Sequence, residues 1–173
     1  MPLPVTIDAP ELITQCRAEF GDGFVSGRSE PEERARALLD ASAGAMSLEQ
    51  AAHLGELLNE HTKVGVTRHD RFSPAFVGAS LQKVTEDLGT FNERVRLLWR
   101  GDDAAASDAL DETLRNRALF PGAGSSLPST LMYLRDPERY AVWITATING
   151  LCKLTGDAGG SKGWPVQVLP AVL

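Results

Sequence analysis

A proline and two glycines interrupt the apolar segments around residues 119–126, and this stretch is the one best suited to chemistry. Pro121, Gly122 and Gly124 form a Pro-Gly-x-Gly hairpin, and Arg115 and Arg117 precede it by one helical turn. Glycine lets a backbone approach a bound group closely, and the N–H groups at the start of a helix attract anions. The arginines would add positive charge, so the hairpin predicts a contact with phosphate.

The expected arrangement is a helix-hairpin-helix-like element that contacts nucleic-acid phosphates. Its predicted contact residues are Arg115, Arg117, Gly122, Gly124 and Ser125. A separate basic loop supplies the other candidate phosphate contacts, which are Lys63, Arg68 and Arg71. Both stretches also have a plain structural interpretation, because glycine-rich connections between packed helices and solvated basic loops are common.

A longer run that starts at the hairpin, residues 121–154, resembles a known pattern. It is similar to helical DNA-glycosylase-type domains and to the N-terminal regions of McrB-like AAA+ ATPases of restriction and defence systems. The positions that carry the resemblance are Ser129, Leu131, Met132, Tyr133, Leu134, Pro137, Glu138, Tyr140, Trp143 and Leu151. The resemblance implies DNA as a partner and a downstream AAA+ domain, with the chain acting as a recognition or regulatory module ahead of it.

The catalytic parts of both families are missing. Where a glycosylase would place its aspartate, the sequence has residues 144–146, Ile-Thr-Ala, so no carboxylate is available to stabilise an oxocarbenium-like transition state. A P-loop needs GxxxxGK followed by Ser or Thr, but here Ser161 precedes Lys162 and Gly163 follows it. We therefore expect a non-catalytic chain without a cofactor.

Metal and nucleophile chemistry find little support in the sequence. His61 and His69 flank a loop, but their spacing matches no familiar ligand pattern, so no metal site is expected. Cys16 and Cys152 have no CxxC partner and no neighbouring histidine, which favours two small buried hydrophobic residues. Ser80 falls within a predicted helix rather than at a sharp strand-to-helix turn.

Helix caps and apolar stripes predict an all-α, compact domain of about eight helices. Caps are expected at Asp8, Ser29, Ser47, Ser73, Thr90 and Asp136, and Gly21, Gly44, Gly89 and Gly101 are expected to end helices. The alanine-rich segment 102–120 and the segment 126–134 complete the set, and no sheet is expected. The core of the last two helices is predicted to contain Leu131, Leu134, Trp143, Ile144, Ile148 and Leu151.

The chain is expected to form one helical domain over residues 1–156. Residues 157–173 are glycine-rich and then apolar, so they are interpreted as a tail or as a linker to a missing downstream domain. The sequence has no apolar run long enough to span a membrane and no signal-peptide pattern, so a soluble, cytoplasmic protein is expected.

The acidic residues are concentrated in the first third of the chain. Residues 1–60 carry four basic and eleven acidic side chains, whereas residues 61–173 carry thirteen and twelve. An acidic protein does not coat nucleic acid non-specifically, although a local phosphate site is compatible with this charge. Two functions thus stay open: a nucleic-acid recognition or regulatory module, and a helical scaffold that binds protein or forms a homo-oligomer through its acidic first third.

Overall fold

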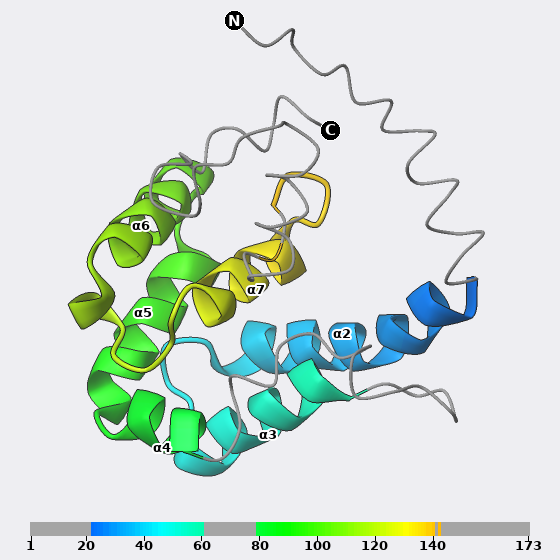
Figure 1. Ribbon diagram of the computed structural model, residues 1–173, viewed down its shortest axis with the longest axis horizontal. Helices are drawn as coiled ribbons and strands as arrows, with labels where there is room; N and C mark the ends of the chain where they lie inside the picture. The colour runs from blue at the N-terminus through cyan, green and yellow to red at the C-terminus, as the bar shows by residue number, and fades with distance from the viewer. Residues whose placement is uncertain (1–21, 61–78, 141, 143–173) are drawn as a thin grey trace, which may run out of the picture.

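The fold is all-helical over the part of the chain that can be described. The computed structural model describes residues 22–60, 79–140 and 142, and six α-helices and one 3-10 helix lie in these ranges, with no strand (Figure 1). The α-helices are α2 (Asp22–Ser42), α3 (Leu48–Asn59), α4 (Ala79–Thr85), α5 (Leu88–Arg100), α6 (Asp103–Arg115) and α7 (Ser126–Arg135), and the 3-10 helix is η3 (Arg117–Leu119). The prediction of an all-α fold is confirmed. The expected helix over residues 8–21 lies outside the described residues, so the expected total of eight stays a prediction.

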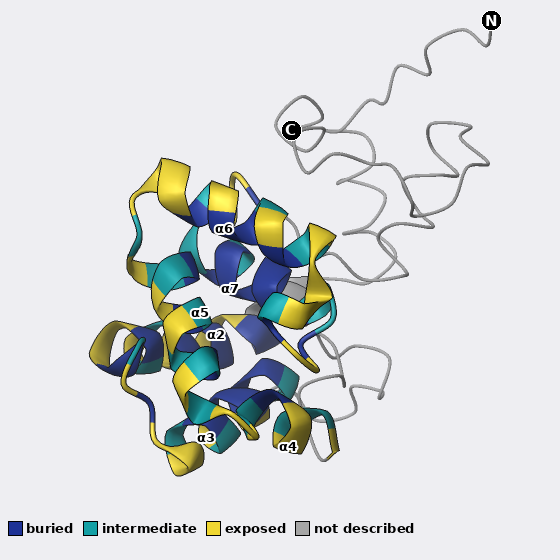
Figure 2. Cartoon of the chain, turned by 90° about the vertical axis from the view of Figure 1, so that its left-hand side faces the viewer, coloured by how far each residue is buried: buried dark blue, intermediate teal, exposed yellow. Residues whose placement is uncertain are grey.

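The core lies where two groups of helices meet. α2 packs against α3, α5 packs against α6 and α7, and α7 also contacts α2. Figure 2 shows the buried faces turned inward and the exposed residues on the outer faces. Phe91, Val95 and Leu98 recur at spacings of three and four along α5, and all three are fully buried. α5 is therefore a central helix of this core. Leu131 and Leu134 are buried as predicted, while the other four residues of the predicted core lie outside the described residues.

The start predicted for α2 is wrong. Ser29 was expected to cap a helix with Pro31 in its first turn, but α2 runs without a break from Asp22 through both residues. A proline inside a helix removes one backbone hydrogen bond and costs stability. In this part of α2 the buried side chain of Arg28 donates to the carbonyl oxygens of Leu58, at 3.4 Å, and Glu60, so the helix contacts the end of α3 before the proline.

The boundary between α4 and α5 also differs from the prediction. Thr90 was expected to be the N-cap of α5 and Gly89 to end the preceding helix, but Asp87 is the cap and Gly89 lies in the first turn. The Asp87 carboxylate accepts the Thr90 N–H at 3.0 Å and the Thr90 hydroxyl at 2.7 Å. These hydrogen bonds lower the pKa of Asp87. An aspartate three residues earlier thus satisfies the donors at the helix start.

Other predicted helix ends are confirmed. Ser47 and Gln50 form a reciprocal capping box at the start of α3, with N–H to oxygen distances of 3.2 and 2.9 Å. Gly44 follows α2 with φ +95°, a conformation that favours glycine, and Gly101 caps the end of α5. The alanine-rich helix α6 stops at Arg115, earlier than expected, and η3 follows it.

The helix expected to begin after Asp136 does not start there. Residues 137–139 form a turn, in which the N–H groups of Arg139 and Tyr140 both donate to the Asp136 carbonyl oxygen. Asp103 at the start of α6 holds this turn, because its two carboxylate oxygens pair with Arg135 at 2.9 Å and Arg139 at 3.1 Å. Residues 143–173, including the proposed domain boundary at 156, lie outside the described residues. No helix in the described ranges is long and apolar enough to cross a bilayer.

Candidate nucleic-acid interface

The loop between η3 and α7, residues 120–125, is anchored by two buried side chains. Phe120 is 1% exposed, and its ring meets that of Phe91 with centroids 6.0 Å apart and planes inclined by 60°. Ala123 is also buried, and its N–H donates to the Phe120 carbonyl oxygen at 3.2 Å. Pro121 and Gly122 lie exposed between these anchors. The loop is therefore a fixed turn with an exposed tip.

The two glycines of this loop have left-handed backbone conformations and different surroundings. Gly122 has φ +81°, and a Cβ at this position would come within 3.0 Å of Lys83 Cγ and 3.1 Å of Val84 Cγ2 on α4. Gly124 has φ +61°, and no atom of the described residues lies within 4 Å of a Cβ built there. Gly122 thus allows the loop to pack against α4, whereas the backbone at Gly124 is open to an incoming group.

The start of α7 offers few backbone donors to an anion. Pro128 has no N–H, and the N–H groups of Leu127 and Ser129 already donate to the carbonyl oxygens of Ala123 and Ser125, at 3.4 and 3.3 Å. The helix terminus is therefore a weak anion site by itself, and side-chain cations must supply most of the attraction for a phosphate.

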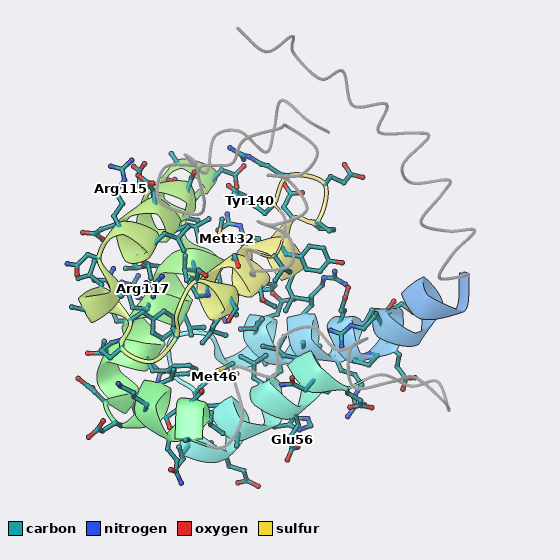
Figure 3. All side chains as sticks on the ribbon, in the orientation of Figure 1. Met46, Glu56, Arg115, Arg117, Met132 and Tyr140 are labelled. Carbon is teal, nitrogen blue, oxygen red and sulfur yellow. The ribbon has the colours of Figure 1, made fainter. Side chains whose placement is uncertain are left out.

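The two predicted arginines differ in their partners. Arg115 pairs with Asp111 one turn earlier on α6, at 2.7 Å, although the arginine side chain is 77% exposed. Arg117 on η3 is exposed and forms no ion pair with any described carboxylate. Figure 3 shows both arginines at the left-hand edge of the molecule, far from the N-terminal end of α2. Arg117 thus lies on the 3-10 helix that leads directly into the loop and has no compensating charge among the described residues, whereas Arg115 is paired with a carboxylate of its own helix.

A cation absent from the sequence prediction lies against the loop. Lys83 is exposed on α4, its aliphatic stem faces Gly122, and it has no ion-pair partner in the described part of the chain. Lys83 is 39 residues from Gly122 in the sequence, so neither spacing nor motif could associate the two. Only the packing of α4 against the loop brings them together.

The structure does not place the other predicted phosphate contacts. Lys63, Arg68 and Arg71 lie outside the described residues, as do His61 and His69. The histidine that is described, His53, faces Glu56 at 3.3 Å on the exposed side of α3. Within residues 22–60 and 79–140, no cluster of His, Cys, Asp or Glu side chains could hold a metal ion.

The helix-hairpin-helix element is not confirmed as such. α6 ends at Arg115, and η3 separates it from the loop that leads into α7. The predicted order of helix, glycine turn and helix is present, but the hairpin does not join two α-helices directly. The motif therefore stays a prediction.

A second polar cluster is buried between α2, α3 and α7. The Glu32 carboxylate lies between Arg28, at 3.6 Å, and Arg36, at 3.4 Å, and it accepts the Tyr133 hydroxyl at 3.4 Å. Burial lowers the pKa of Arg28, and burial together with the Glu32 charge raises the pKa of Tyr133. Arg36 also donates to the Leu134 carbonyl oxygen at 2.7 Å. These contacts join three helices, so the cluster has a structural role.

A comparison of the chain with models of protein families, with curated proteins and with solved structures finds no match. The resemblance of residues 121–154 to McrB-like N-terminal regions therefore rests on those residues alone.

Proposed function

We propose that the chain is a non-catalytic helical module that contacts nucleic-acid phosphates through residues 120–125 and the cations around them. The observation that carries the proposal is the open space on the Cβ side of Gly124, in a loop that directly follows η3 and its exposed Arg117, which has no ion-pair partner among the described residues. A phosphate group fits such a place because it needs close backbone approach together with a compensating positive charge.

The expected binding is weak and electrostatic. The loop presents few cations, so it neutralises about two or three phosphates, and the affinity should fall gently as salt is added. The chain as a whole carries a net charge of −6, which opposes binding to nucleic acid away from the loop. A local contact is thus the only form of nucleic-acid binding that this charge distribution favours.

Binding of the whole chain to a short duplex DNA, followed by fluorescence anisotropy over a series of salt concentrations, tests the proposal. The parent protein should bind at low salt, and the double variant R115E/R117E should not. The thermal midpoint should be nearly the same in both, because exposed charges contribute little to stability. Absence of binding by the parent at low salt, or equal binding by the two proteins, would contradict the proposal and leave the helical scaffold as the remaining function.

The context of the module is part of the same proposal. The resemblance at residues 121–154 supports a place ahead of an AAA+ domain in a restriction or defence system. A GxxxxGK[ST] motif in the reading frame beyond Leu173 would support this context, because backbone N–H groups and the lysine of that motif bind the nucleotide phosphates. A stop codon directly after Leu173 would contradict it.

A further inference from the structure

The cations near residues 120–125 come from helices that the sequence keeps far apart. Lys83 lies on α4, and Arg117 lies on η3, which leads directly into the loop. A Cβ on Gly122 would lie 3.1 Å from Lys83 Cβ and 3.0 Å from Lys83 Cγ, so the lysine stem runs along the loop backbone. The neighbouring Val84 is 3% exposed and holds α4 in place from the core side.

Arg115 differs from Lys83 and Arg117 in that it already has an ion-pair partner. The Arg115 guanidinium already has the Asp111 carboxylate at 2.7 Å, so a phosphate there would have to compete with an existing ion pair. Lys83 and Arg117 pair with no carboxylate in the described ranges, so an approaching phosphate would meet their full charge. An ammonium on a flexible stem acts as a point charge and is well suited to a phosphate oxygen.

We infer that Lys83 of α4 is a phosphate-contacting residue of this site together with Arg117, and that Arg115 is peripheral to it. The inference rests on the proposed function and makes it more specific. The site then takes about two nucleic-acid phosphates, one at each of these cations, at a loop that α4 and η3 both border, instead of a row of phosphates along α6. Glycine at position 122 favours this arrangement, because a Cβ there would lie 3.0 Å from Lys83 Cγ and would press on the lysine stem.

Single charge-removing variants of the whole chain test this inference with the same duplex DNA. K83Q keeps the Cβ and Cγ atoms that pack against Gly122 but removes the charge and shortens the side chain, while K83R keeps the charge on a long side chain. R117Q and R115Q probe the two arginines, and R34Q is a control with the same change in net charge, because Arg34 is exposed on α2 and its carboxylate partner among the described residues is Glu60, at 3.2 Å.

K83Q and R117Q should each weaken binding and reduce the slope of log Kd against log salt concentration by about 1, the effect of losing one phosphate contact. R115Q and R34Q should leave both quantities close to those of the parent, and K83R should bind as the parent does.

Binding by K83Q equal to that of the parent, while R117Q is weakened, would overturn the inference and leave the proposed function standing. An equal loss in R34Q would also overturn it, because the effect would then follow net charge. A parent protein that does not bind would refute the proposed function itself.

Discussion

The side-chain amide of Asn92 forms two hydrogen bonds with the backbone of Met46. The Met46 N–H donates to Asn92 Oδ1 at 2.7 Å, and Asn92 Nδ2 donates to the Met46 carbonyl oxygen at 2.9 Å. Met46 is 2% exposed and lies in the connection between α2 and α3. One side chain of α5 thus satisfies both backbone groups of a buried residue and holds that connection against the core.

Replacement of Asn92 by alanine should destabilise the protein by about 1 to 3 kcal/mol, because a buried N–H and a buried carbonyl would both lose their partners. Urea unfolding followed by circular dichroism measures the change. Asn116→Ala is a suitable control, since its side chain is exposed and, among the described residues, accepts the Ala118 N–H at 3.2 Å. An equal loss in the two variants would contradict the importance of the Asn92–Met46 pair.

Replacement of Arg28 by methionine should destabilise the protein by about 3 to 5 kcal/mol, because it leaves the buried Glu32 carboxylate with one charged partner fewer. The double variant R28M/E32Q should recover part of that loss in urea unfolding, since it also removes the buried carboxylate charge that Arg36 alone would then have to balance. A double variant that is less stable than R28M would show that Glu32 is held mainly by Arg36 and Tyr133.

Stability at high pH should depend on Tyr133. Burial, followed by the negative charge of Glu32, raises the pKa of the phenol in the folded protein above its unfolded value of about 10. The folded state therefore holds this proton more tightly, and the resulting stabilisation is complete below about pH 10 and is lost as pH rises through the folded pKa. Thermal midpoints over the alkaline range should fall less steeply for Tyr133→Phe than for the parent. Identical pH profiles would contradict the shift.

The two loop glycines should differ in their tolerance of alanine. Gly124→Ala should cost about 1 to 2 kcal/mol, because it adds backbone strain at a positive φ without a steric contact. Gly122→Ala should cost more, since its Cβ also meets Lys83 and Val84. The difference in free energy of unfolding between the two variants measures the contact with α4, and equal values would show that α4 yields to the new methyl group.

Local signals in the sequence determined several helix ends. In the capping box, the side chains of Ser47 and Gln50 each accept the backbone N–H of the other residue, three positions away. Gly44 adopts its left-handed conformation just after the helix that it ends. Such interactions need no distant partner, so they can be predicted from residue types and spacing. The all-helical class follows from the same source, because apolar stripes with a period near 3.6 residues recur along the chain.

The tertiary structure decided the rest, because contacts between distant residues outweighed the local signals. Ser29 and Pro31 are a strong local start signal, yet α2 runs through both, and Arg28 in the same stretch donates to a carbonyl oxygen near the end of α3, 30 residues away in the sequence. Part of the candidate site could likewise be predicted from the sequence, and part of it depends on tertiary packing. Its glycines and arginines are adjacent in sequence, but the contact between Lys83 and Gly122 exists only because α4 packs against the loop, and no sequence pattern encodes which helix will lie there.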